Sequence, residues 1–192
     1  MKTSIRALLV AAIVASPIVP AYAQTADSNA EILQGLQSTL SDAPQVSAQA
    51  LRDLAKAHIV QYPGANPPPL SVQLDNLAQI NVQIQFDLNS AMIKPESYRT
   101  IGSIADALHH PILMGYRFIV VGNTDATGTR ERNLVLSQER ADAIVQALTT
   151  TFGVNPASLE SVGLGQEALQ DTKNPDAAVN RRVQIFNIGK LK

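Results

Sequence analysis

Apolar and polar residues alternate strictly over residues 80–86, and this alternation predicts a strand that is buried on one face. Residues 116–121 form a short apolar run of the kind found in buried strands, and residues 159–164 form a weaker one. Residues 182–188 alternate again and predict the last strand. We therefore expect four strands in the C-terminal part of the chain.

Apolar residues at helical spacing separate these strands. One predicted helix begins near Pro95, which suits a first helical turn, and a longer one carries Leu136 and Leu148 on its inner face and ends near Gly153. Strands that alternate with helices predict a two-layer α/β sandwich. We expect a mixed sheet in which the first strands are parallel neighbours and the last strand runs antiparallel.

Two shorter helices are predicted within residues 24–61, and Ser47 can cap the second of them. Each helix places its apolar residues on one face: Ile32, Leu33, Leu36 and Leu40 in the first, and Leu51, Leu54, Ala55 and Ile59 in the second. Two such helices cannot bury a core alone, so residues 29–60 should dock on the main domain, self-associate or bind an envelope protein partner. A docked helical hairpin is the favoured interpretation, with His58 on the helix surface.

Proline-rich residues separate this helical segment from the predicted sheet. Three consecutive prolines within residues 62–77 favour an extended, stiff spacer. We therefore divide the chain into a leader over residues 1–23, a helical segment over residues 24–61, a linker over residues 62–77 and an α/β domain over residues 78–189.

The first residues resemble a cleavable secretory signal. Lys2 and Arg6 precede an apolar run, and the small residues Ala21 and Ala23 stand at the −3 and −1 positions before Gln24. The run is short for a membrane span, so an N-terminal anchor is the less favoured alternative, and no span is expected after cleavage. The chain has no cysteine, which excludes lipid attachment at the cleavage site and leaves stability to an ordinary core.

Charge and residue types exclude several classes of function. The chain has 15 basic and 16 acidic residues, and loss of Lys2 and Arg6 would leave 13 basic ones, which argues against nucleic acid as a partner. The three histidines fall outside the candidate motifs, and no nucleophile with a neighbouring base is visible. We therefore expect no enzyme activity, no metal and no cofactor.

Residues 121–140 carry the candidate binding chemistry. Asp125 lies in the loop after the second strand, and Asn133 and Arg140 are seven residues apart on one face of the next helix. Because helical side chains lean toward the N-terminus, these three groups can converge on one cleft. Arginine matches a carboxylate and aspartate an amine, so the ligand would be zwitterionic. An internal salt bridge between Asp125 and Arg140 is an equally open interpretation.

Four motifs in this order strengthen the ligand interpretation: FDLNSA at residues 86–91, GNTDATG at 122–128, NLVLSQERA at 133–141 and NRRV at 180–183. Together they resemble the OmpA-like C-terminal domain family, as in outer-membrane protein A, the peptidoglycan-associated lipoprotein and MotB. The resemblance covers about residues 78–189 and implies an OmpA-like sandwich with βαβαβ-β order. It also implies non-covalent binding of peptidoglycan through the diaminopimelate of the stem peptide.

The resemblance implies a role for each residue that matches a family motif. Asp125 would meet the diaminopimelate amine and Arg140 its carboxylate. Further residues implied to line the same cleft are Asn89, Thr124, Asn133 and Arg181. The family usually has His where this chain has Asn123, which keeps a hydrogen-bonding side chain but does not titrate near neutral pH.

A wall-associated protein of the Gram-negative periplasm is the biological role that the resemblance implies. Such a protein would tether an envelope component to the cell wall. The alternative is a periplasmic interaction or scaffold module, in which the N-terminal helices bind a partner and wall binding is weak or absent.

Overall fold

The computed structural model describes most of the chain, namely residues 28–37, 46–64, 69–70, 74 and 77–191. The predicted leader, Leu40 and much of the predicted linker lie outside the described residues, so the proposed boundaries remain predictions. Within the described ranges, none of the helices has both the length and the apolar character required to cross a bilayer.

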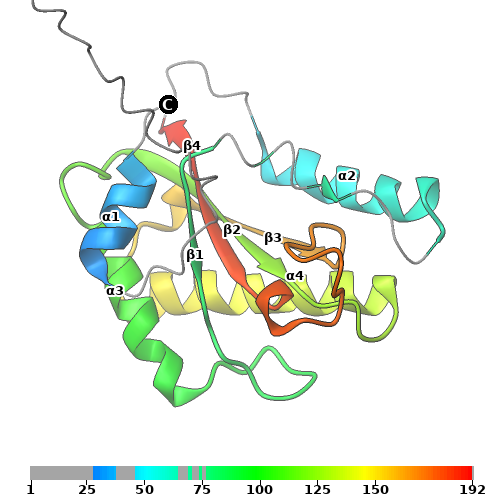
Figure 1. Ribbon diagram of the computed structural model, residues 1–192. Coiled ribbons are helices and arrows are strands. Elements are labelled where there is room, and N and C mark those ends of the chain that lie inside the picture. Colours follow the sequence, from blue (N-terminus) through cyan, green and yellow to red (C-terminus); the bar gives the residue numbers. More distant parts are fainter. Residues whose placement is uncertain (1–27, 38–45, 65–68, 71–73, 75–76, 192) are drawn as a thin grey trace, which may run out of the picture.

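A four-stranded mixed sheet forms the centre of the molecule, with the order β1-β4-β2-β3 (Figure 1). Its strands are β1 (Gln79–Val82), β2 (Tyr116–Asn123), β3 (Leu159–Gly165) and β4 (Val183–Lys190). The neighbours β2 and β3 are parallel, whereas β4 is antiparallel to both β1 and β2. The mixed sheet and the antiparallel last strand are therefore confirmed. The first two strands, however, are not neighbours, because β4 lies between them.

The first strand is shorter than the alternation predicted. It ends at Val82, although Ile84 is still buried and Gln83 and Gln85 are still exposed. Beyond it, Phe86 forms an isolated antiparallel bridge with Ile93, which closes a loop next to the sheet. The chain that leaves β1 is thus free to form a wall beside the sheet.

Four α-helices pack around this sheet: α1 (Asn29–Gln37), α2 (Ala48–Gln61), α3 (Tyr98–Leu108) and α4 (Arg130–Gln146). Ser47 caps α2 as predicted, because its side chain accepts a hydrogen bond from the backbone N–H of Ala50. Thr129 caps α4 by accepting from the N–H of Arg132. The N-terminus of α4 is therefore fixed directly after the loop that carries Asp125.

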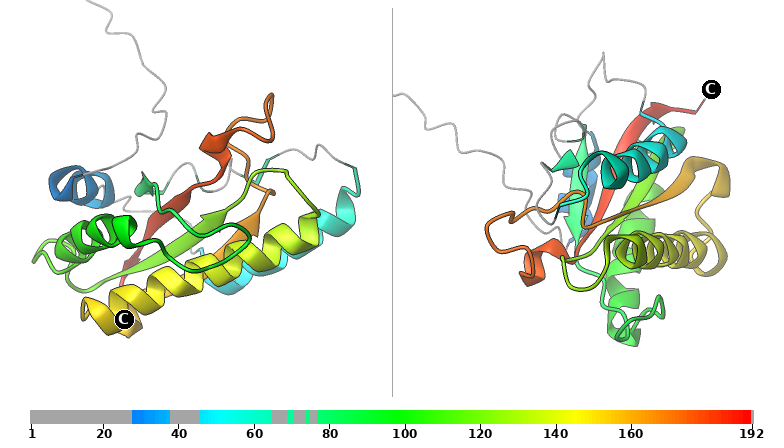
Figure 2. Two further views of the ribbon diagram at one scale, coloured as in Figure 1. Left: turned by 90° about the horizontal axis from the view of Figure 1, so that it is seen from below. Right: turned by 90° about the vertical axis from the view of Figure 1, so that its right-hand side faces the viewer.

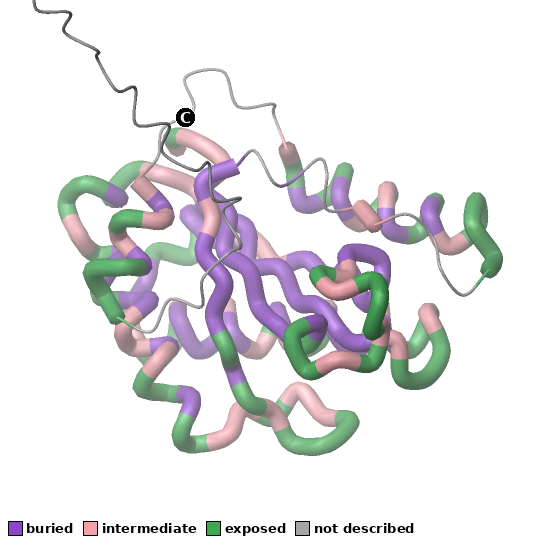
Figure 3. Tube along the Cα trace, viewed as in Figure 1, coloured by how far each residue is buried: buried purple, intermediate pink, exposed green. Residues whose placement is uncertain are grey.

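Two apolar cores lie on opposite faces of the sheet. Phe118 and Val120 of β2 pack in one core with α1, α3 and α4, whereas Ile119 and Val121 belong to a second core with α2. The strands are buried along most of their length (Figure 3). The predicted two-layer sandwich is confirmed for the first core, and α2 adds a further layer on the other face.

The N-terminal helices do dock, but they do not form a hairpin. Ile32 and Leu36 of α1 are fully buried in the first core, while Leu51 and Ala55 of α2 are buried in the second. Figure 2 shows α2 well apart from α1 and α3. Burial of each Leu or Ile side chain contributes about 1.5–3 kcal/mol to stability, so apolar burial holds both helices on this domain.

Buried charges hold the C-terminal end of α2, and the expectation that His58 lies on the helix surface is wrong. The Nδ1 atom of His58 lies 2.6 Å from Oε2 of Glu167, and Arg130 binds the same carboxylate through Nε at 2.9 Å and through Nη2. Arg130 also donates to the backbone carbonyls of Tyr62 and Gly64. The hydrogen bond with Glu167 raises the pKa of Arg130, so this guanidinium stays charged.

Candidate ligand-binding site

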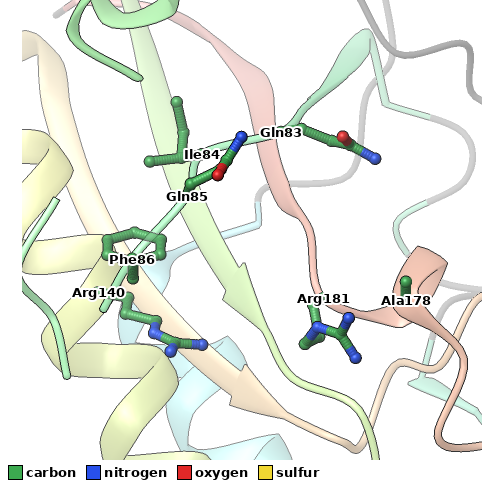
Figure 4. A pocket seen from close by; sticks show the side chains of 7 residues that line it. All are labelled: Gln83, Ile84, Gln85, Phe86, Arg140, Ala178 and Arg181. Carbon is green, nitrogen blue, oxygen red and sulfur yellow. The ribbon is translucent and has the colours of Figure 1, made fainter. Parts of the chain in front are cut away.

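A cleft of about 330 Å³ opens where the chain leaves β1 (Figure 4). Three parts of the chain form it: the segment after β1, the middle of α4, and the turn before β4. The lining residues are Gln83, Ile84, Gln85, Phe86, Arg140, Ala178 and Arg181. Two guanidinium groups therefore line one cleft.

Contacts with Ser90 and Phe86 fix the orientation of the Arg140 side chain. Its Nε donates a 3.0 Å hydrogen bond to the carbonyl of Ser90, and its guanidinium carbon lies 4.8 Å from the ring centroid of Phe86, a cation–π distance. Within the described part of the chain, neither Nη group has a hydrogen-bond partner. The two Nη amino groups are therefore oriented and available, which is the arrangement that a bidentate carboxylate requires.

Burial and the neighbouring charges do not all shift the pKa of Arg140 in the same direction. Burial lowers the pKa of Arg140, the carboxylate of Asp125 raises it, and the charges of Arg181 and Arg132 lower it further. The largest effect is loss of water around the guanidinium, so the group lacks much of its usual solvation. An anion bound beside the guanidinium would compensate for the favourable interactions with water that burial removes.

Asp125 is paired with Arg181 and not with Arg140. Its Oδ2 accepts a 2.6 Å hydrogen bond from Nη1 of Arg181, and its Oδ1 accepts a 3.1 Å bond from the N–H of Thr127. The internal Asp125–Arg140 salt bridge is therefore not formed. The Asp125 side chain is 12% exposed, whereas that of Arg181 is half exposed, so Arg181 covers the acid on the side of the cleft.

Asn133 supports the loop from inside. Its Nδ2 lies within hydrogen-bonding distance of the carbonyls of Asp125 and Thr127, at 3.1 and 3.2 Å, and of Oε1 of Gln166, at 2.7 Å. Asn133 is buried and is absent from the residues that line the described cleft. The seven-residue spacing correctly placed it on the loop side of α4, but its partners are the loop backbone and the side chain of Gln166.

Thr124 and Asn89 also lie outside the described cleft. Thr124 is buried, and its N–H donates to the carbonyl of Gly165 at 2.9 Å. Asn89 is exposed, has a positive φ of 51°, and sits in the loop that also supplies the Ser90 carbonyl to Arg140. The structure therefore brings Arg140 and Arg181 into the cleft, places Asp125 next to them, and leaves the other predicted residues as supports or neighbours.

Asn123 points away from the cleft. Its Nδ2 donates a 3.1 Å hydrogen bond to Oε1 of Gln184, and Gln184 in turn donates to Gln79 at 3.0 Å. Gln184 alternates along β4 with Val183 and Ile185, which belong to the α1, α3 and α4 core. Gln184 and Asn123 therefore lie on the α2 side of the sheet.

The polar and aromatic groups that were not predicted to line the cleft come from Gln83, Gln85 and Phe86. Gln83 and Gln85 were assigned to the first strand. They line the cleft because β1 ends at Val82, before both of them. Phe86 belongs to the first family motif, but its stacking on Arg140 joins positions that are far apart in the sequence. The sequence signal for this wall of the cleft is the polar–apolar alternation of residues 80–86, which continues beyond the end of β1.

Comparison with known proteins identifies the family. The sequence model of the OmpA family matches residues 85–182, which is just over half of the chain, and the chain therefore belongs to this family. The predicted resemblance is confirmed. Helices α1 and α2 and strands β1 and β4 lie outside the matched residues.

Two sequence relatives agree with this assignment. The peptidoglycan-associated lipoprotein of Pseudomonas putida is 36% identical over 126 residues, covering 64% of this chain and 74% of that protein. Outer membrane protein A of Bordetella avium is 30% identical over 136 residues, covering 70% and 66%. Among solved structures, the peptidoglycan-associated lipoprotein of Burkholderia pseudomallei is 32% identical, covers 54% of this chain and 87% of that chain, and has a TM-score of 0.45.

Proposed function

We propose that this protein binds peptidoglycan non-covalently through the diaminopimelate of the stem peptide. The observation that carries the proposal is the guanidinium of Arg140, which is oriented by Ser90 and Phe86 and keeps its Nη groups open to the cleft. Membership of the OmpA family and a relative named peptidoglycan-associated lipoprotein support peptidoglycan as the larger ligand.

Each charged group of the cleft has a proposed role. Arg140 receives the carboxylate at the side-chain end of diaminopimelate in a bidentate pair, which is the geometry that a guanidinium fork provides. Asp125 receives the neighbouring amine once Arg181 has moved from it. Asn133 fixes the loop backbone around Asp125 and so acts as a positioning residue.

A wall-binding domain behind a secretory leader fits the Gram-negative periplasm, where the protein would tether an envelope component to the wall. We propose a binding protein and not an enzyme. The groups gathered at the cleft are two guanidinium groups, a carboxylate and amides, which suit recognition of charge and hydrogen bonds.

Co-sedimentation with purified sacculi tests the proposal. The wild-type protein should pellet with sacculi, whereas Arg140→Ala and Asp125→Ala should stay in the supernatant. Arg99→Ala is the matched control, because Arg99 is exposed on α3, outside the described cleft. Thermal unfolding of all four proteins separates lost binding from lost folding. Equal pelleting of folded Arg140→Ala and wild type would rule out the site.

A protein-interaction module is the second candidate function, and a groove between α2 and α4 favours it. The groove has a volume of about 510 Å³ and crosses β3 at Gly163. Lys56 lies on its α2 side, and Val135, which is half exposed, and Asp142 lie on its α4 side. If the wild-type protein does not pellet with sacculi, the interaction-module function is favoured over wall binding.

A further inference from the structure

The two guanidinium groups of the cleft carry one positive charge more than the one acid that pairs with either of them among the described residues. Arg140 and Arg181 both line it, and Asp125 is the acid paired with Arg181. The nearby Arg132 already has an acidic neighbour of its own, since it lies 3.9 Å from Glu139. A ligand part with one amine and one carboxylate is neutral and would leave this excess uncompensated.

We propose that Arg181 forms a second carboxylate subsite, so that the cleft prefers stem peptides that end in diaminopimelate. This inference rests on the proposed function. When diaminopimelate is the last residue of the stem, its backbone carboxylate is free in addition to the side-chain carboxylate and amine. Such an end carries a net charge of −1, which matches the excess positive charge of the cleft. When a further residue follows, that backbone carboxylate becomes a neutral amide.

The contacts of Arg181 suit such an exchange. One hydrogen bond, from Nη1 to Oδ2 of Asp125, holds the guanidinium, and its side chain is half exposed. Among the described residues, its Nε and Nη2 atoms have no hydrogen-bond partner. Because the Arg181 end of this ion pair is half exposed, Arg181 can turn to another anion at small cost when a cation takes its place at the buried Asp125.

The exchange leaves every charge paired. The ligand amine takes the place of Arg181 at Asp125, Arg181 turns to the backbone carboxylate, and Arg140 keeps the side-chain carboxylate. The charge of Arg181 also disfavours the charged form of Arg140. An anion bound at Arg181 would weaken this repulsion, so the two carboxylates should bind cooperatively.

The test uses two soluble disaccharide–tripeptides that end in diaminopimelate. One has the free backbone carboxylate, and the other has the same group as a carboxamide. Isothermal titration should show binding of the free acid about tenfold tighter than the amide, because one charge-assisted hydrogen-bonded pair is lost. In Arg181→Gln, the two peptides should bind with nearly equal affinity, while Arg99→Gln should keep the wild-type ratio.

The outcomes separate this inference from the proposed function. Equal binding of acid and amide by the wild type, with binding still lost in Arg140→Ala, overturns the second subsite and leaves wall binding intact. A wild-type preference that persists in Arg181→Gln also overturns it, because another group would then hold the carboxylate. Absence of wild-type binding to both peptides overturns the proposed function together with the inference.

Discussion

The carboxylate of Asp125 lies 2.6 Å from the guanidinium of Arg181, and Arg140 stays free of it. An aspartate and an arginine that face one ligand cannot serve it while they neutralise each other. In this fold, the arginine that covers the acid comes from the turn before β4 and is half exposed. The arginine with open Nη groups comes from α4 and is stacked on Phe86. The cleft therefore contains two different arginines. Arg140 is fixed by its contacts with Ser90 and Phe86, whereas Arg181 can be displaced from Asp125.

Asn133→Ala should lower the free energy of unfolding by about 2 kcal/mol, since it leaves the carbonyl of the buried Asp125 without its donor. The affected acceptors are the carbonyls of Asp125 and Thr127. Urea unfolding measures the change. Asn29→Ala, at an exposed position at the start of α1, is the control and should change stability by less than about 0.5 kcal/mol. A loss for Asn133→Ala as small as that of the control would contradict the supporting role.

Glu167→Gln should destabilise the protein by about 3 kcal/mol, because it removes the buried anion between two partners. Glu167 is 1% exposed and contacts both Arg130 and His58. Hydrogen exchange of the α2 amides should accelerate, since this cluster fixes the end of that helix. Glu139→Gln is the matched control, because Glu139 is half exposed and its ion pair is long. Unchanged α2 protection in Glu167→Gln would show that apolar contacts alone hold the helix.

Gly163→Ala should be strongly destabilising, by about 3 kcal/mol or more, because the added carbon meets helix backbone that cannot move aside alone. A Cβ at Gly163 would lie 2.2 Å from the backbone nitrogen of Gln138 and 2.6 Å from its Cα. Gly64→Ala is the control, since a Cβ there meets nothing within 4 Å. Similar melting temperatures for the two variants would mean that α4 is not as close to β3 as the structure places it.

Asn123→His should leave affinity for the wall within about twofold of wild type, a change below 0.5 kcal/mol. The side chain at this position bonds to Gln184 on the α2 side of the sheet and does not line the described cleft. An imidazole N–H can donate to the same acceptor. Co-sedimentation over a range of sacculus concentrations checks this. A large gain in affinity would place residue 123 in the ligand site after all.

Local patterns in the sequence identified the elements well. The alternation around Ile185 and the helical spacing of Ile101, Ile104 and Leu108 correspond to a buried strand and a buried helix face. The cap at Ser47 was also visible, because it depends on residues three apart. Such features rest on contacts between near neighbours in the chain.

Long-range pairings were beyond the sequence patterns. His58 and Glu167 are 109 residues apart, and neither position reveals that the other will be buried beside it. The same holds for Arg181 and Asp125, which are 56 residues apart. The periodicity of α1 and α2 showed that each has an apolar face, but not that the two faces meet opposite sides of the sheet. These outcomes depend on contacts between elements that are far apart in the sequence.

The most direct test of the account compares two soluble stem peptides that differ at one residue, diaminopimelate or lysine. Both offer the side-chain amine, but lysine lacks the side-chain carboxylate proposed to bind Arg140. Titration calorimetry with the wild-type protein should give binding of the diaminopimelate peptide at least about tenfold tighter, the value of one charge-assisted pair. In Arg140→Ala, the two peptides should bind equally weakly. Equal affinity of the wild type for both peptides would contradict the proposed role of Arg140.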